Sequence, residues 1–219
     1  MANILEVQKV DKLFDDKQIL KNVNLTISKG EIVGIIGRNG SGKTVLLKII
    51  SGLYYPSKGK IKFYNNIDKK MGVFIDVGFL PNKTGLQNLL IISNLCKDVS
   101  KEKCFRLMEE VGLDPFNKNP YKNYSTGMKQ RLALAYSLME DPEFLILDEP
   151  FSGIDKESVK EFRNLLLKLK KAGKTILITS HHQEDINLLC DKVFQMDNGI
   201  LEVLKWKKTI LLSYQPFYR

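Results

Sequence analysis

Apolar residues in the first part of the chain recur at every second position, a pattern that predicts β-strands. The pattern runs through Ile4–Val10 and returns at Val23, Leu25 and Ile27. A continuous apolar run then covers Ile32–Ile36. A run without alternation predicts a strand that is buried on both faces.

Helical spacing begins after this run, at Thr44–Ser51, and Gly52 marks its end. The turn Pro56–Gly59 precedes a short predicted strand near Lys60–Phe63, and another strand is predicted at Gly72–Ile75. Strand and helix therefore alternate in this part of the chain.

The middle of the chain changes character. Leu86–Leu95 and Lys101–Val111 carry apolar residues at helical spacing, which predicts a helical lobe at about residues 82–138. Beyond the lobe, strand and helix patterns alternate again at Phe144–Leu147, Lys156–Lys171, Thr175–Thr179, Ile186–Cys190 and Val193–Met196. This order predicts an α/β core of about residues 1–81 and 139–219, with a mostly parallel sheet covered by helices and the lobe inserted into it.

Composition is typical of a soluble globular domain, at 43% hydrophobic and 27% charged residues. No stretch approaches the roughly 20 apolar residues that cross a bilayer. The first residues lack the layout of a signal peptide, so we expect a cytoplasmic protein. Cys96, Cys104 and Cys190 form no CxxC pair and are expected to be reduced, buried thiols.

The net charge of +9 is spread along the chain rather than gathered in a tail. Lysine-rich, solvated faces account for such a charge, and proximity to anionic lipid headgroups is the alternative. No basic stripe interleaved with aromatic residues is present, so nucleic acid is not an expected partner. The segment 206–219 is basic and aromatic, and either packs against the core or contacts a partner.

The clearest chemical signal is a complete GxxxxGK[ST] loop between a predicted strand and a predicted helix. It comprises Gly37, Arg38, Asn39, Gly40, Ser41, Gly42, Lys43 and Thr44. Its glycines let backbone N–H groups close on phosphate oxygens, and the helix that follows adds the positive end of its dipole. Lys43 is expected to reach the β- and γ-phosphates, and Thr44 to bind Mg²⁺. The loop predicts a P-loop NTPase core.

Two adjacent acids, Asp148 and Glu149, end the buried strand Phe144–Leu147. Carboxylates at that end of a parallel strand lie at the sheet edge where ligands bind. Asp148 suits a Mg²⁺ ligand, and Glu149 suits the base that orients an attacking water.

The segment Tyr124-Ser125-Thr126-Gly127-Met128-Lys129-Gln130-Arg131 carries no decisive chemistry of its own. Ser125 is a helix-capping residue type, and Gly127 leaves the first turn exposed with free N–H donors. Such a turn either caps a helix or holds an anion.

Combined with the phosphate loop and the Asp148-Glu149 pair, this segment resembles the signature motif of the ABC-transporter ATPase family. The family's commonest wording is LSGGQ; here the serine and the second glycine are kept and Met128 replaces the glutamine. The wording YSTGMKQR is most similar to exporters of the antibiotic-resistance and ABC-2 type. The resemblance covers nearly the whole chain and implies one domain, 1–219, with an N-terminal antiparallel β part.

The resemblance assigns further residues. Ser125, Thr126 and Gly127 would meet the γ-phosphate held by a second copy of the chain. His181 is similar to the switch histidine that contacts the γ-phosphate, and Asp155 to the D-loop residue that bridges the two sites.

Two further positions matter. Phe14 stands where the family places an aromatic ring that stacks on adenine, and a core phenylalanine is the alternative. The family has glutamine, and the antibiotic-exporter group often has glutamate, where this chain has Asp76. Aspartate is one methylene shorter than glutamate, so direct contact with Mg²⁺ or its water is expected to be strained.

The resemblance implies the ATP-hydrolysing subunit of an ABC transporter, with export as the expected direction of transport. It also implies that the subunit uses ATP and Mg²⁺ and closes head to tail as a homodimer or with a related ATPase subunit. Its partner would be a separate integral membrane permease that holds it on the inner face of the membrane, with the helical lobe and the Asp76 region as the contact. The family's drug-exporting members often carry an extended C-terminal region, and we expect it to be missing here because Arg219 follows soon after the last family-like strand. A soluble ABC ATPase acting on ribosomes or nucleic acid is the alternative, and a P-loop kinase or GTPase fits less well because neither explains Ser125, Gly127 and His181.

Overall fold

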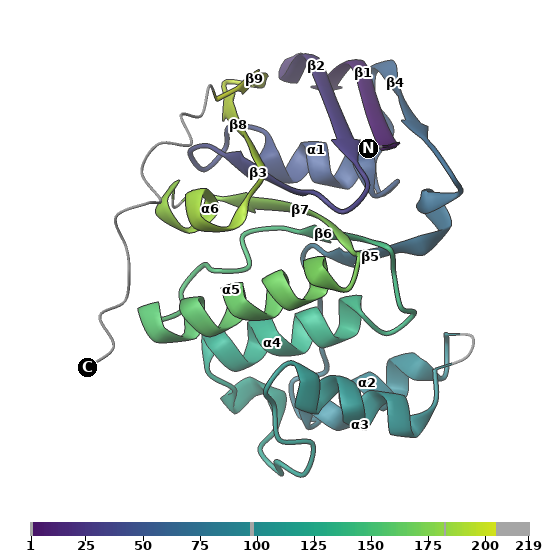
Figure 1. The fold of residues 1–219 in the computed structure, drawn as a ribbon, viewed down its shortest axis with the longest axis vertical. Coiled ribbons are helices and arrows are strands. Elements are labelled where there is room, and N and C mark those ends of the chain that lie inside the picture. Colours follow the sequence, from purple (N-terminus) through teal and green to yellow (C-terminus); the bar gives the residue numbers. More distant parts are fainter. Residues whose placement is uncertain (1, 97–98, 182, 205–219) are drawn as a thin grey trace.

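The computed structural model describes residues 2–96, 99–181 and 183–204, so the basic, aromatic segment 206–219 lies outside the described residues. Two β-sheets and six α-helices make up the described part (Figure 1). The mixed α/β class and the mostly parallel sheet predicted from the sequence are confirmed.

The smaller sheet is antiparallel with strand order β2-β1-β4. Its strands are β1 (Asn3–Phe14), β2 (Lys17–Ser28) and β4 (Lys58–Phe63). Alternation sets the register: Leu5 lies opposite Ile27, and Val7 opposite Leu25, so that apolar residues share one buried face.

The larger sheet has strand order β5-β6-β7-β3-β8-β9, and every neighbouring pair is parallel except β8 and β9. Its strands are β3 (Ile32–Ile36), β5 (Met71–Phe74), β6 (Phe144–Leu147), β7 (Thr175–Ser180), β8 (Lys192–Asp197) and β9 (Ile200–Val203). The central strands β3, β6 and β7 are buried throughout, which is why they read as continuous apolar runs.

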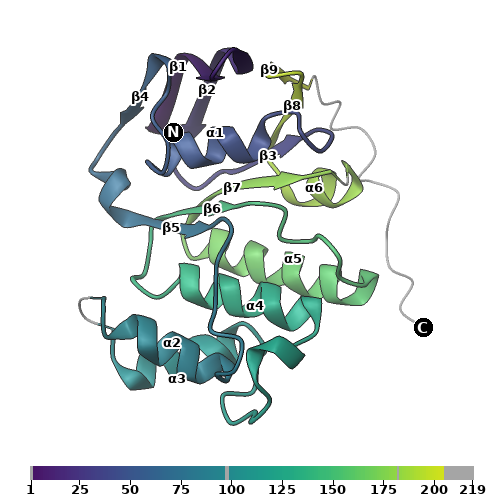
Figure 2. The same ribbon diagram turned by 180° about the vertical axis from the view of Figure 1, so that it is seen from behind.

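The helices form separate layers around the larger sheet (Figures 1 and 2). They are α1 (Lys43–Ile50), α2 (Gly85–Ser93), α3 (Lys101–Glu110), α4 (Thr126–Ser137), α5 (Lys156–Lys171) and α6 (Gln183–Leu189), with short 3₁₀ turns at Ile67–Lys70 and Tyr121–Asn123. Helix α1 lies between the two sheets, whereas α4 and α5 cover the opposite face of the larger sheet. Helices α2 and α3 lie beyond α4, at the end of the molecule farthest from the antiparallel sheet.

Strand β3 belongs to both hydrophobic cores. Val33 and Ile35 pack in the cluster shared with α1 and the antiparallel sheet, whereas Ile32 and Ile36 pack in the cluster shared with α4, α5 and α6. The strand is fully enclosed because successive side chains point to opposite faces. The loop that follows it is therefore anchored from both sides of the sheet.

The first helix of the predicted lobe begins with a capping box. The Thr84 hydroxyl accepts a hydrogen bond from the Gln87 N–H, and the Gln87 side chain accepts one from the Thr84 N–H. Helices α2, α3 and α4 all fall within residues 82–138, the range predicted for the lobe. Across the part of the chain that the structure describes, no helix has the length and apolar character needed to cross a membrane.

Candidate functional site

The phosphate-loop sequence joins the end of β3 to the start of α1. Arg38, Asn39 and Gly40 are exposed at its crest. Gly42 immediately precedes α1 with φ of 114°, a backbone conformation that a side chain would strain. No side chain caps this end of α1 and its first turn holds no acidic residue, so its N–H groups and dipole are available to an anion.

Close packing shapes the rest of the loop. A Cβ at Gly37 would lie 2.3 Å from the carbonyl oxygen of Met196, so a side chain there would displace the backbone of β8. The hydroxyl of Ser41 is buried and has no hydrogen-bond partner among the described residues. A buried hydroxyl without a partner in a glycine-rich loop fits a site built for phosphate oxygens.

Lys43 is almost completely buried, with 5% of its side chain exposed. Its ammonium group donates to the carbonyl oxygens of Gly37, at 2.7 Å, and Arg38, at 3.2 Å. It also pairs with the Glu149 carboxylate at 3.1 Å. The loop thus folds around a single positive charge, which faces the two acids at the end of β6.

Thr44 and Asp148 meet across the site, although they are 104 positions apart in the sequence. The Thr44 hydroxyl donates to one Asp148 carboxylate oxygen at 2.7 Å. Within residues 2–96, 99–181 and 183–204, no group of three or more His, Cys, Asp or Glu side chains is arranged to hold a metal ion. Mg²⁺ does not need such a cluster, since it takes one or two protein oxygens together with water and substrate phosphate. The pair fits that ion.

Glu149 has a left-handed backbone, with φ of 49°. Its carboxylate accepts a hydrogen bond from the His181 N–H at 3.2 Å and lies 2.8 Å from the ring nitrogen Nδ1 of the same residue. Because Lys43 contacts its other oxygen, the carboxylate is held from two sides. The predicted residues Lys43, Thr44, Asp148, Glu149 and His181 therefore converge on one place.

Asp76 is engaged in a different way. Its carboxylate forms an ion pair with Lys48 of α1 at 2.7 Å and is otherwise largely exposed. That carboxylate, chiefly through its hydrogen bond, raises the pKa of Lys48, and the charge of Asp148 adds a smaller effect in the same direction. Asp76 is thus connected to the site by its ion pair with Lys48, which lies one helical turn after Thr44 in α1.

Phe14 lies at the end of β1, with 40% of the residue exposed. Its ring contacts Tyr54 edge to face at 5.6 Å between centroids, and the Lys12 ammonium lies 4.7 Å from the ring centre. The alternative of a core phenylalanine is wrong, because the ring ends the strand at the surface instead of entering the apolar face.

The signature-like segment lies at the start of α4. The Ser125 hydroxyl accepts a hydrogen bond from the Met128 N–H at 3.2 Å, so it caps the helix. Ser125 and Thr126 are exposed. A Cβ at Gly127 would meet Ile154 at an ordinary 3.6 Å, which shows that the loop before α5 lies against this turn.

Asp155 caps α5. Its carboxylate accepts from the N–H groups of Glu157, at 3.1 Å, and Ser158, at 3.0 Å. The backbone hydrogen bond from Ser158 has the largest effect in lowering the pKa of Asp155, and the hydrogen bond from the Ser158 side chain has the next largest. Within a single chain, the role of Asp155 is therefore to cap α5.

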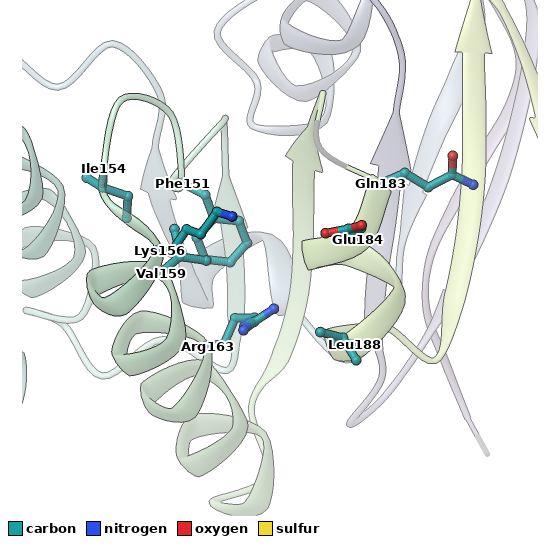
Figure 3. A pocket seen from close by; sticks show the side chains of 8 residues that line it. All are labelled: Phe151, Ile154, Lys156, Val159, Arg163, Gln183, Glu184 and Leu188. Carbon is teal, nitrogen blue, oxygen red and sulfur yellow. The ribbon is translucent and has the colours of Figure 1, made fainter. Parts of the chain in front are cut away.

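Two hollows in this part of the molecule are large enough to consider as ligand sites. The first, beside the phosphate loop, is lined by Ile36, Gly37, Arg38, His181, Gln183, Gln195, Met196, Asp197 and Asn198. The second separates α5 from α6 and is lined by Phe151, Ile154, Lys156, Val159, Arg163, Gln183, Glu184 and Leu188 (Figure 3). The first hollow includes Gly37 and Arg38 of the phosphate loop, whereas the second contains no residue of that loop.

Two residues that contribute to the site were not predicted from the sequence: Lys48, which pairs with Asp76, and Thr179, which contacts both acids. A signal existed for Thr179, since a hydroxyl within a fully buried strand must find hydrogen-bond partners. The sequence contains no comparable signal for Lys48, because a lysine in a helix is ordinarily solvated.

The phosphate loop joins a parallel strand to a helix, and two acids face it: Asp148 is hydrogen-bonded to Thr44, and Glu149 is paired with Lys43. This arrangement defines a P-loop nucleotide-binding protein. The family model described as "ABC transporter" matches residues 20–152. The chain belongs to the ABC transporter family, as its ATP-binding and ATP-hydrolysing subunit.

Individual proteins agree with this assignment. The chain is 40% identical to an uncharacterised ABC transporter ATP-binding protein, YybJ of Bacillus subtilis, over 91% of this chain and 95% of that protein. It is 36% identical to the bacitracin transport ATP-binding protein BcrA of Enterococcus faecalis, over 92% of this chain and 68% of BcrA. Among solved structures, a nucleotide-free ATP-binding cassette from an ABC transporter superposes with a TM-score of 0.82 at 25% identity, over 91% of this chain and 89% of the cassette.

Proposed function

We propose that this subunit powers export through a separate integral membrane permease, which holds it at the inner face of the cell membrane. The similarity to BcrA, named for bacitracin transport, supports a transport role, and the wording YSTGMKQR of residues 124–131 supports export. The observation that carries the ATP-driven part of the proposal is the convergence of Lys43, Glu149 and His181, which is suited to hydrolysis as well as to binding.

ATP binds with its phosphates in the loop 37–44, where Lys43 and the N–H groups at the start of α1 face the β- and γ-phosphates. Phe14 stacks on the adenine ring from the exposed end of β1. Thr44 and Asp148 would hold Mg²⁺, and Asp76, through its ion pair with Lys48, would lie close enough to contribute. A bound Mg²⁺ supplies neutralisation of charge on the phosphate oxygens.

Glu149 orients the attacking water. Its carboxylate is fixed between Lys43 and His181, so its position is set before the reaction starts. Lys43 and His181 stabilise the negative charge on the departing phosphate, because phosphoryl transfer depends mainly on positioning and charge compensation.

Two copies of the chain close head to tail over two nucleotides. Ser125, Thr126 and Gly127 of one copy complete the site of the other, and exposure of this turn supports that role. Asp155 lies in the loop that packs against the same turn, which places both segments on one surface.

Glu149→Gln is the direct test. We expect the variant to bind ATP, to form a dimer that ATP stabilises, and to lose about 100-fold or more of its turnover, since the amide cannot accept a proton. Gel filtration with ATP and Mg²⁺, together with a phosphate-release assay, measures both effects. Glu109→Gln, the same substitution at an exposed position of α3, is the matched control and should leave both unchanged.

A Glu149→Gln protein that stays monomeric with ATP would contradict the head-to-tail dimer. Turnover close to that of the unsubstituted chain would remove Glu149 from the catalytic role.

A further inference from the structure

Thr179 is a polar residue inside a buried strand. It lies in β7, whose six residues are all buried, and its own exposed fraction is 0%. A hydroxyl in such a place costs free energy unless it is hydrogen-bonded. Its partners therefore indicate why the strand tolerates it.

The Thr179 hydroxyl contacts both acids of the site. It donates to the Asp148 carboxylate oxygen Oδ1 at 2.6 Å and accepts from the Glu149 backbone N–H at 2.9 Å. The direction of both bonds is fixed: an N–H can only donate, so the single hydroxyl proton of Thr179 goes to Asp148.

The first of these bonds orients Asp148. With Oδ1 held by Thr179, the other carboxylate oxygen points to the Thr44 hydroxyl at 2.7 Å. Rotation of the Asp148 side chain would break both bonds. The carboxylate is thus aligned with the first turn of α1.

The second bond holds the backbone of Glu149. A φ of 49° is uncommon for a residue other than glycine and persists only when its surroundings fix it. The Glu149 N–H is bonded to Thr179, and in this conformation the Glu149 carboxylate reaches both Lys43 and His181.

We propose that the Thr179 hydroxyl is a positioning residue for ATP hydrolysis: it fixes the rotamer of Asp148 and the backbone of Glu149 at the same time. Thr179 acts through these two residues and touches no reacting atom. The inference rests on the function proposed above for Glu149 and Asp148.

Thr179→Val removes the hydroxyl at nearly constant volume, whereas Thr179→Ser keeps it. We expect Thr179→Val to lower kcat by about 10- to 100-fold, because small displacements of a catalytic group have effects of this size. The affinity for a fluorescent ATP analogue measured with EDTA should change by less than about threefold, since the phosphate loop is intact. The Mg²⁺ concentration for half-maximal activity should rise, and Thr179→Ser should recover kcat to within about threefold.

The same strand provides a matched control. Thr175 is also buried, with 1% exposed, and its hydroxyl accepts from the Gly30 N–H at 2.9 Å at the opposite end of β7. Thr175→Val therefore removes one buried hydroxyl from the same strand without touching the two acids. It should lower thermal stability as Thr179→Val does but keep kcat.

Three outcomes would overturn the proposal: an unchanged kcat in Thr179→Val, equal losses in Thr179→Val and Thr175→Val, or no recovery in Thr179→Ser. Should Thr179→Val fail to fold, as judged by its thermal unfolding, the comparison of Thr179→Ser with Thr179→Ala decides in the same way. Glu149→Gln is assayed in parallel. If that variant keeps its turnover, the proposed role of Glu149 has failed, a result that is distinct from a failure of the Thr179 proposal.

Discussion

At the scale of single residues, Phe14 shows how exposure can indicate a binding role. The ring ends β1 at the surface and is supported by Tyr54 and by the Lys12 ammonium. A ring that is supported by neighbours and is still 40% exposed can stack on a planar base. The Lys12 charge adds an attractive neighbour for that ring.

Phe14→Ala is expected to weaken ATP binding about tenfold, since loss of base stacking on an aromatic ring costs about 1–3 kcal/mol. Phe14→Tyr should keep most of the affinity. Equilibrium titration with a fluorescent ATP analogue measures both. Phe116 is 72% exposed in the loop after α3 and provides the control: Phe116→Ala should leave affinity unchanged. Equal affinity for the unsubstituted chain and Phe14→Ala would remove Phe14 from the binding site.

At the scale of secondary-structure elements, the starts of α4 and α5 share one construction. Each begins with a side chain that caps it, Ser125 in α4 and Asp155 in α5. Each also lies in the loop assigned to the dimer surface. A residue that caps its own helix holds the turn rigid for an incoming partner, so the capping interpretation and the family interpretation of Ser125 are compatible.

The Asp155 cap predicts a dependence of stability on pH. Folding lowers the pKa of this carboxyl from its ordinary 3.8, so the folded state binds its proton less readily than the unfolded state. Its stabilising contribution is therefore present above the ordinary pKa and is lost as the pH falls through the lower, folded value. We expect Asp155→Asn to be less stable than the unsubstituted chain at neutral pH, with the difference shrinking below about pH 4.

Urea unfolding at several pH values measures this difference in the free energy of unfolding. Asp68→Asn, in the exposed first turn of the 3₁₀ segment Ile67–Lys70, is the control. A difference for Asp155→Asn that stays constant down to the lowest pH would contradict the assignment.

The sequence predicted the elements that have a local pattern. Strands β3, β6 and β7 were evident as apolar runs, and the phosphate loop as a contiguous motif. Strand β9 was not predicted, because only four residues form it and they are mostly exposed, which leaves no apolar alternation to detect. Short edge strands depend on their neighbour, here β8, more than on their own residues.

Contacts between distant residues were beyond sequence reasoning for a different reason. The bond between Thr179 and Asp148 joins residues 31 positions apart, and the pair of Lys48 with Asp76 joins α1 to the segment after β5. Such pairs depend on the register of neighbouring strands and on the packing of a helix against the sheet. The chemistry of each acid was foreseeable, but the groups that orient it were not.

At the scale of the whole molecule, the proposed dimer makes each active site the product of two chains. Lys43 would come from one copy and Gly127 from the other. A C₂ arrangement would then contain two identical composite sites. Two variants defective in different halves should therefore complement each other.

Lys43→Ala and Gly127→Asp are suitable variants. Aspartate in the first turn of α4 favours the helix dipole, and a Cβ at Gly127 meets nothing closer than 3.6 Å, so the fold should tolerate it. Its charge would repel the γ-phosphate of the partner copy. Each variant alone should have almost no ATPase activity. An equimolar mixture should recover up to about a quarter, because half of the randomly formed dimers are mixed and each has one intact site.

The double variant Lys43→Ala/Gly127→Asp, mixed with Lys43→Ala, is the control and should recover nothing, since no pairing restores an intact site. Phosphate release from both mixtures decides the matter. An equimolar mixture of the single variants that remains as inactive as its components would contradict the composite site.

The double role of β3 has a consequence for the stability of the protein. Its side chains enter both hydrophobic clusters, and the phosphate loop continues directly from its end. Neither cluster can open without displacing the strand, so local unfolding on either side of the sheet would also dismantle the loop. ATP binding, which stabilises any state that has an intact loop, would therefore protect the cluster of α4 and α5 as well as that of the antiparallel sheet. The stabilisation that ATP gives should therefore be felt on both sides of the larger sheet.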